Sequence, residues 1–156
     1  MKISIPSKIS FIRRDNFNLK VFYCVNDDYY EIKAYNGINQ EVARLTFKAS
    51  KKDRYIWLYK ISTDEKYQHK GYGTALIYAL EYVAKKLRFD QIEGKFYPEN
   101  EFAKPFYDKH DYAIYKDGYE TFITKSLDYE EIKQQIEPYV TEFEIIQKSN
   151  ENQKDI

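Results

Sequence analysis

The hydrophobic pattern of this chain changes its period once, and that change limits the folds open to it more than any other feature. Before residue 63, apolar and polar side chains alternate in successive short segments such as Leu19–Val25 and Glu41–Ala49. Segments of period two that are separated by turn signals such as Asn36-Gly37 predict the strands of an antiparallel meander. From Thr74 to Leu87, the apolar residues recur at helical spacing instead. The sequence therefore predicts a sheet domain with helices packed on it, which is the α/β or α+β class.

The expected elements follow the chain as a β-meander, a strand–helix–strand unit, a second helix and a β-hairpin. The strands are Lys8–Arg14, Leu19–Val25, Tyr29–Tyr35, Glu41–Ala49, Tyr55–Ser62, Gln91–Tyr97, Tyr112–Lys116 and Tyr119–Lys125, and the helices are Thr74–Leu87 and Asn100–His110. Tyr55–Ser62 is almost continuously apolar or aromatic, which predicts a central strand covered on both faces. Asp117-Gly118 predicts a tight hairpin turn, and Asn100 predicts a helix N-cap.

The chain divides into three predicted parts. Residues 1–127 form the sheet domain. Asp128–Lys148 predicts a helical extension, because Asp128 and Glu131 have capping-box spacing, and Pro138 should bend it. This extension either packs on the domain or contacts a partner, which includes a second copy of the chain in a homodimer. Ser149–Ile156 is polar and predicts a disordered tail.

Composition excludes several classes of function. The chain has 156 residues, which corresponds to one domain, and a chain of this size buries roughly 70% of its unfolded surface without disulfides. Lys+Arg and Asp+Glu both number 25, so the formal net charge is zero. Proteins that bind nucleic acids through phosphate contacts are usually basic overall or carry a basic stripe, so nucleic-acid binding is disfavoured.

Cysteine, histidine and hydropathy exclude further classes. Cys24 is the only cysteine, so neither an intrachain disulfide nor a thiolate zinc site is expected. His69 and His110 lack the spacing of a metal-binding helix, so no metal is expected in the reaction. No apolar run approaches the ~20 residues of a membrane span, and the N-terminal segment has no secretory pattern. We therefore expect a soluble, cytoplasmic protein.

A glycine-containing loop between the fifth predicted strand and the first predicted helix points to an anionic ligand. It reads Gln68-His69-Lys70-Gly71-Tyr72-Gly73-Thr74. Glycines permit positive φ and close backbone approach, and the N–H groups and dipole of a helix N-terminus favour a phosphate. The loop is neither a Walker A loop nor a dinucleotide fingerprint. Its alternative is a tight strand–helix turn with no ligand.

A second motif follows the next predicted strand, and it helps to interpret the glycine-containing loop. It consists of Asn100, Ala103, Phe106, Tyr107, Lys109 and Tyr112 in the pattern N-x-x-A-x-x-F-Y-x-K-x-x-Y. Together with Gln68-x-x-Gly71-x-Gly73, it resembles the signatures of the GCN5-related N-acetyltransferase (GNAT) family, over roughly Glu41 to Lys125. The resemblance implies a mixed, mostly antiparallel central sheet flanked by helices, with acetyl-coenzyme A as the acyl donor.

The resemblance also implies roles for individual residues. The backbone amides of Gln68, His69, Lys70, Gly71, Tyr72, Gly73 and Thr74 would hold the pyrophosphate of acetyl-coenzyme A. The preceding strand, at Ile61, Ser62 and Thr63, would pair with the pantetheine arm and would be splayed from its neighbour. Asn100 would contact the coenzyme A arm, and Tyr107 would protonate the leaving thiolate. The alternative for Tyr107 is an ordinary buried aromatic residue in a tyrosine-rich chain.

The sequence departs from the family pattern at three places. Asp111 stands where glycine is usual, so an aspartate must adopt positive φ there. Pro105 falls inside the predicted second helix and should bend it, so that its Asn100 and Tyr107 ends do not share one straight axis. The family's N-terminal helices are reduced, because Lys8–Phe47 is β-rich, so the acceptor cleft is either open or built by another element such as Asp128–Lys148.

These features predict transfer of an acetyl group to a primary amine of a small molecule or a protein. The general base is not identified. Glu93 shares one face of its strand with Gln91 and Lys95, and this face lies either toward the cleft or toward solvent, with solvent favoured. Asp64 and Glu65 are expected to be solvated loop carboxylates, and a water chain is the alternative. A different function also fits, namely a catalytically inactive module with the acyl-coenzyme A fold that binds a protein partner.

Overall fold

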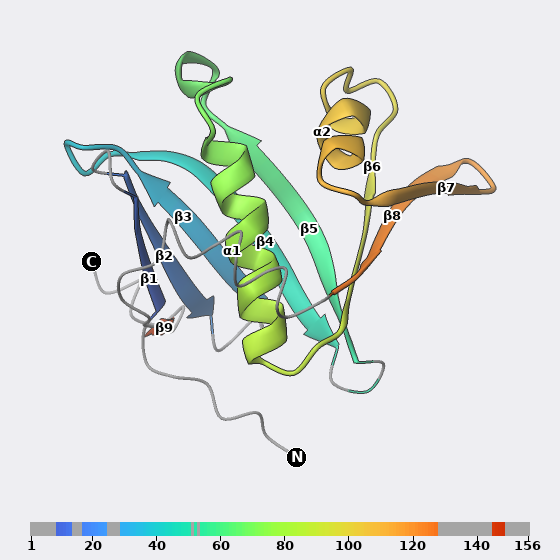
Figure 1. The fold of residues 1–156 in the computed structure, drawn as a ribbon, viewed down its shortest axis with the longest axis horizontal. Coiled ribbons are helices and arrows are strands. Elements are labelled where there is room, and N and C mark those ends of the chain that lie inside the picture. The colour runs from blue at the N-terminus through green and yellow to red at the C-terminus, as the bar shows by residue number, and fades with distance from the viewer. Residues whose placement is uncertain are drawn as a thin grey trace.

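The structure is a computed structural model that describes residues 9–13, 17–24, 29–50, 52, 54–127 and 145–148. These residues form a mixed sheet of nine strands in the order β1-β2-β3-β4-β5-β6-β8-β7, with β9 paired to β2, and two α-helices (Figure 1). The strands are β1 (Ile9–Arg13), β2 (Phe17–Cys24), β3 (Tyr29–Tyr35), β4 (Glu41–Ser50), β5 (Tyr55–Thr63), β6 (Gln91–Phe96), β7 (Ala113–Asp117), β8 (Glu120–Ser126) and β9 (Ile145–Lys148). The helices are α1 (Tyr72–Lys86) and α2 (Ala103–Lys109), and a 3-10 turn spans Glu65–Tyr67.

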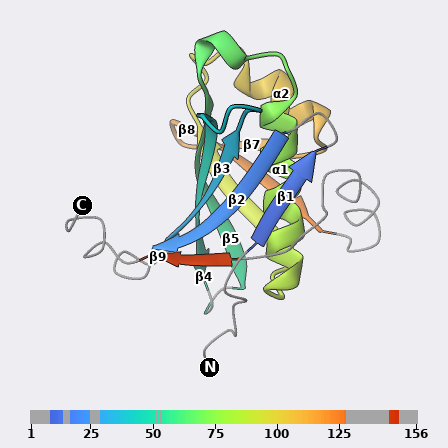
Figure 2. The ribbon, with the colours of Figure 1, turned by 90° about the vertical axis from the view of Figure 1, so that its left-hand side faces the viewer.

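The predicted meander is confirmed. β1 to β5 pair consecutively and antiparallel, and Ala43, Leu45 and Phe47 of β4 are buried on one face. Figure 2 shows α1 lying along one side of the sheet. The helical stripe predicted for α1 is buried against it, at Leu76, Leu80, Val83 and Leu87. The core therefore lies between α1 and the face of the sheet that carries these alternating residues.

β5 is covered differently from the prediction. Ile56 and Leu58 are buried, but Tyr59 is 63% exposed and Lys60 is exposed as well. The expectation of cover on both faces was wrong for this half of the strand, because both helices of the described residues lie on the same side of the sheet. The face of β4 to β8 opposite α1, called the open face below, is where these polar and aromatic side chains lie.

The C-terminal segment also differs where the structure describes it. Ile145–Lys148 is strand β9, parallel to Val21–Cys24 of β2, and not the end of a helix. β1 pairs with β2 only as far as Val21, so β9 continues the hydrogen bonding along the part of β2 beyond that pairing. Residues 128–144 and 149–156, the rest of the predicted extension and tail, lie outside the described residues, as does the side chain of Cys24.

The hairpin after α2 is confirmed with a shift of one residue in its turn. β7 and β8 pair as far as Asp117 and Glu120, so the turn residues are Gly118 and Tyr119 and not Asp117 and Gly118. Gly118 has φ 64°, as the first central position of a type II′ turn requires. The hairpin therefore extends the sheet beyond β6 and presents β7 at its edge.

Candidate active site

β5 and β6 are parallel strands that separate part-way along their length. Their pairing covers Ile56–Ile92, Trp57–Glu93 and Leu58–Gly94 and then stops. β5 nevertheless continues to Thr63 and β6 to Phe96, and Figure 1 shows the two strands diverging toward the end where α1 begins. The sheet thus contains a wedge, open at the N-terminal end of α1, whose two sides present backbone groups that the β5–β6 ladder does not use.

A β-bulge in β5 lies at the closed end of this wedge. The register with β4 runs through Thr46–Lys60 and resumes at Phe47–Leu58, so Tyr59 is the extra residue. A bulge leaves its extra residue outside the ladder and turns the strand locally. The splay predicted for this strand is therefore present, and it starts at the bulge.

Ile61, Ser62 and Thr63 form the β5 side of the wedge. They pair with Leu45, Arg44 and Ala43 of β4 along one edge of the strand. The opposite edge, beyond Leu58, faces the wedge, so its backbone N–H and C=O groups are positioned to pair with an extended ligand.

The loop before α1 lies at the open end of the wedge. Gly71 is the N-cap of α1 with φ 92°, and its position provides no side-chain cap. The first-turn N–H groups of Tyr72, Gly73 and Thr74 consequently point out of the helix end, where the helix dipole favours an anion. His69 also has positive φ, at 63°, and the side-chain Nε2 of Gln68 donates to the Thr63 carbonyl at 3.2 Å, which ties the loop to β5.

The two glycines of the loop have different roles, which corrects the sequence interpretation. Gly71 adopts positive φ, but Gly73 is helical. A Cβ at Gly73 would lie 3.2 Å from Cε1 of Phe106 in α2, so Gly73 permits the close approach of the two helices. The pair of glycines therefore shapes both the uncapped N-terminal end of α1 and its contact with α2.

α2 brings Tyr107 into the site. The helix begins at Ala103, so Pro105 lies in its first turn, where a missing N–H is tolerated, and the predicted break does not occur. Tyr107 is buried, with its ring edge-on to Tyr112 at 5.6 Å and close to Phe96 of β6 at the same distance. Burial raises the pKa of Tyr107 to about 12, and no described residue is a hydrogen-bond partner of its hydroxyl.

Asn100 stabilises the turn that precedes α2 and is not the N-cap of the helix. Its Oδ1 accepts from the Phe102 amide at 3.1 Å, and its carbonyl accepts from the Ala103 amide at 3.1 Å. The N-cap position belongs to Phe102, whose ring meets His69 of the α1 loop edge-on at 5.7 Å. The structure therefore brings the Asn100 segment and the glycine loop together across the wedge.

His110 is a site residue whose structural role the sequence analysis missed. It is buried at the end of α2, and its Nε2 lies 3.2 Å from the Thr74 hydroxyl in the first turn of α1. Burial, and secondarily Lys109 and Lys125, lower the pKa of His110 from 6.5 to about 4, so the imidazole is neutral. The one available signal was its place three residues after the motif tyrosine. The adjacent Asp111 has φ 65°, as predicted for the position where the family has glycine.

The carboxylates considered as a general base lie in different surroundings. Asp64 and Glu65 are exposed beyond the end of β5. Glu93 is half-buried on the open face, and its Oε1 accepts hydrogen bonds from Gln91 at 2.6 Å and Thr124 at 2.9 Å. It is thus held in place and is not a freely solvated side chain.

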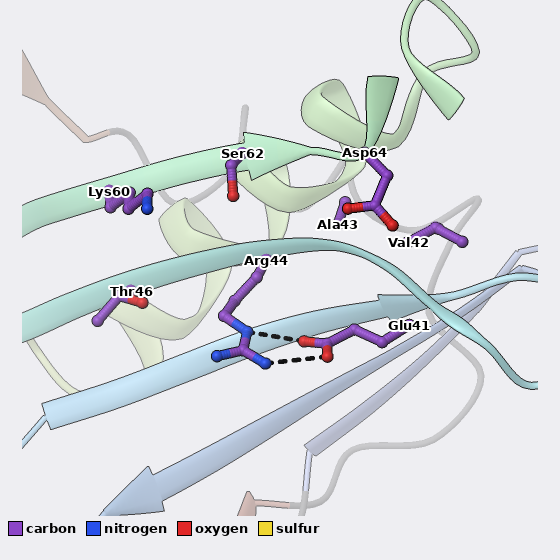
Figure 3. A pocket seen from close by; sticks show the side chains of 8 residues that line it. All are labelled: Glu41, Val42, Ala43, Arg44, Thr46, Lys60, Ser62 and Asp64. Carbon is purple, nitrogen blue, oxygen red and sulfur yellow. Dashed lines mark hydrogen bonds and ion pairs between the residues drawn. The ribbon is translucent and has the colours of Figure 1, made fainter. Parts of the chain in front are cut away.

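A polar hollow of about 380 Å³ lies beside the wedge on the open face, over β4 and β5 (Figure 3). The Arg44 guanidinium lies in it and donates two hydrogen bonds to the Glu41 carboxylate, at 2.7 and 2.9 Å. It also forms an ion pair with Glu31 at 3.1 Å. Lys60, Ser62 and Asp64 complete the wall. Ser62 belongs both to the wall of this hollow and to the β5 side of the wedge.

The sequence of this chain matches the model of a known protein family. A family model described as the acetyltransferase (GNAT) family matches residues 10–112, which include the wedge, the glycine loop and α2. The chain belongs to the GNAT family. No curated protein matches it in a sequence comparison.

Solved GNAT structures have the same fold. A GNAT-family acetyltransferase from Staphylococcus aureus Mu50 aligns with TM-score 0.60 and 17% identity, over 67% of this chain and 72% of that one. The PaiA N-acetyltransferase of Thermoplasma acidophilum, solved with coenzyme A, aligns with TM-score 0.59 and 19% identity, over 65% and 63%. An acetyltransferase from Bacillus subtilis, also in complex with coenzyme A, gives 0.58 and 16%, over 65% and 79%.

The described residues contain neither a candidate metal cluster nor a candidate membrane-spanning helix. Within them, no three or more His, Cys, Asp or Glu side chains are grouped so as to hold a metal ion. The helices of the same residues are also too short or too polar to cross a membrane.

Proposed function

We propose that this protein transfers the acetyl group of acetyl-coenzyme A directly to a primary amine. The observation that carries the proposal is the wedge between β5 and β6, with the anion-facing N-terminus of α1 at its open end. A ligand with an extended arm and a pyrophosphate fits both features. Membership of the GNAT family supports the same assignment.

The residues available to hold the donor come from two elements. The backbone amides around Gln68–Thr74 would bind the pyrophosphate, since the first turn of α1 lacks a capping side chain. The wedge edge of Ile61–Thr63 would pair with the pantetheine arm, and Asn100 would contact that arm from the α2 side. When bound, the donor supplies a thioester carbonyl that an amine can attack.

The chain's own residues would then act at the closed end of the wedge. A backbone N–H at the bulge around Tyr59 would stabilise negative charge on the carbonyl oxygen, because it lies outside the regular ladder. Tyr107 would donate its proton to the leaving sulfur. Its pKa of about 12 keeps the hydroxyl protonated at neutral pH, and the contact of its ring with Phe96 of β6 supports this role.

Turnover with a panel of amines tests this proposal. Thiol release from acetyl-coenzyme A should depend on an amine, and mass spectrometry should detect the acetylated amine. The panel should include a diamine, an amino acid and a lysine peptide. Binding of acetyl-coenzyme A without amine-dependent thiol release from any of them would contradict the proposal and favour the alternative, an inactive acyl-coenzyme A module that binds a protein partner.

A further inference from the structure

We propose that Glu93, Trp57 and Tyr115 form the binding site for the alkylammonium group of the acceptor. This inference rests on the proposed function, since it assigns the amine side of the same reaction. The three residues come from β6, β5 and β7, and they lie together on the open face of the sheet.

The strand register places this cluster next to the closed end of the wedge. Trp57 of β5 pairs with Glu93 of β6, and Glu93 pairs with Thr124 of β8, so these three side chains share one row on one face. The next pair, Leu58–Gly94, is the last before β5 and β6 separate. Glu93 is therefore one residue away from the point where the wedge begins.

The Glu93 carboxylate is fixed by neutral donors. Gln91 and Thr124 both donate to Oε1, and the Tyr115 hydroxyl also hydrogen-bonds to this carboxylate. A carboxylate has about four acceptor positions, so one more donor can be accommodated. Neutral donors leave its charge uncompensated, which favours a cationic ligand.

The lysines around the cluster do not compensate this charge. Within the described part of the chain, Lys95, two residues further along β6, pairs with Glu120 at 3.7 Å, and Lys125 pairs with Glu81 at 2.6 Å. In that part, no ion pair joins Glu93 to Lys95, to Lys125 or to Lys48, which lies opposite Trp57 on β4.

Aromatic rings lie next to the carboxylate on the open face. Trp57 meets Phe122 at 6.4 Å between ring centroids, and Phe122 stacks on Tyr115 at 5.4 Å. Trp57 lies in the same row as Glu93, whereas Phe122 of β8 and Tyr115 of β7 lie in the adjacent row, that of Lys95. Aromatic faces attract ammonium groups, and their apolar surface suits the methylene groups next to a primary amine.

A second hollow gives the rest of an acceptor a place to lie. It has a volume of about 450 Å³ and includes both Gln91 and Thr124, the two donors to Glu93 Oε1, in its wall. The polar hollow over β4 has neither of these two donors in its wall. We therefore place the acceptor chain toward β8, with its amine at Glu93.

Trp57 is the only tryptophan of the chain, so its fluorescence reports directly on this site. The full-length protein should be titrated with n-butylammonium chloride at constant ionic strength, and in parallel with n-butanol. We expect saturable quenching by butylammonium and not by butanol. Glu93→Gln should weaken butylammonium binding by at least about tenfold, as for the loss of a charged hydrogen bond, whereas Lys95→Gln should bind like the wild type.

Several outcomes would overturn the inference. These are absence of saturable quenching by butylammonium, equal quenching by butanol, and a Glu93→Gln protein that binds like the wild type while keeping its far-ultraviolet circular dichroism. The titration contains no acetyl-coenzyme A, so failure of the proposed function is recorded separately. A protein that binds butylammonium through Glu93 but does not bind acetyl-coenzyme A would refute the acetyltransferase proposal and leave the ammonium site standing.

Discussion

Tyr107 shows how one residue's surroundings set its chemistry. The chain has 17 tyrosines, but Tyr107 combines the motif position with a buried ring and a pKa raised to about 12. Because the folded-state pKa lies above the ordinary value of 10, the proton-donating form persists as pH rises through the range in which enzymes are usually assayed. Deprotonation of Tyr107 should therefore not limit turnover below about pH 10.

Replacing the Tyr107 hydroxyl should slow the reaction without preventing donor binding. We expect Tyr107→Phe to keep its affinity for acetyl-coenzyme A and to lower kcat by about 100-fold, the lower range for loss of a general acid. Stopped-flow or steady-state thiol release would measure it. Tyr119→Phe, at the fully exposed hairpin tip, is the matched control. Unchanged turnover in Tyr107→Phe would remove this residue from the mechanism.

His110 should make stability depend on pH in the acidic range. Its folded-state pKa is lowered to about 4, so between pH 6.5 and 4 the unfolded chain binds a proton that the folded chain does not. Stability should therefore fall as pH falls through this window, by about 2 to 3 kcal/mol near pH 4.5 relative to pH 7. Urea unfolding across this range should show the loss in the wild type.

The two histidines allow a matched comparison for that effect. His110→Gln removes the titrating group, so its stability should change less with pH than that of the wild type. His69→Gln changes an exposed histidine and should retain the wild-type slope. Identical pH dependence in His110→Gln and the wild type would contradict the assignment of this effect to His110.

At the scale of elements, the wedge depends on how closely β5 and β6 approach before they separate. A Cβ at Gly94 would lie 2.9 Å from the Leu58 carbonyl oxygen and 3.2 Å from Ile123. Gly94 therefore permits the last β5–β6 pair. The atom nearest to an added Cβ belongs to the backbone of β5, so a rotamer change cannot relieve the clash.

Adding one methyl group at Gly94 should test this packing. Gly94→Ala should lower the free energy of unfolding by about 2 kcal/mol, as overpacking of a close-packed interior does. Gly37→Ala, at the exposed turn between β3 and β4, should change it by less than about 0.5 kcal/mol. Urea denaturation of both variants measures the difference, and equal stability of Gly94→Ala and the wild type would show that the two strands can move apart freely.

The elements differ in how far their sequences predict them. α1 and the β1–β5 meander follow from periodicity, because Leu76, Leu80 and Val83, like Leu45 and Phe47, bury one face each. α2 was predicted too long, because Asn100 was assigned its ordinary capping role and instead caps the turn before the helix. β9 could not be predicted, because its pairing with β2 depends on which part of that strand β1 leaves unpaired.

At the scale of the whole molecule, the motifs predicted where the two sides of the wedge would be but not how the open face is built. Gln68–Thr74 and Tyr107 could be chosen as candidate site residues from local sequence, since each lies within one short motif. Glu93 was expected to face solvent, from the alternation along β6. That alternation cannot show that Tyr115 and Thr124, from two other strands, hydrogen-bond to its carboxylate. Such contacts between distant segments depend on register, which a single sequence does not specify.

The central claim is that the wedge and the N-terminus of α1 bind acetyl-coenzyme A, and calorimetric titration tests it most directly. The wild type should bind with one site per chain. Gly71→Asp should abolish binding, because it places a carboxylate at the anion-facing helix end, whereas Gly118→Asp, the same change at another glycine with positive φ, should bind like the wild type. A folded wild type that does not bind acetyl-coenzyme A, or a Gly71→Asp variant that binds it normally, would contradict the account.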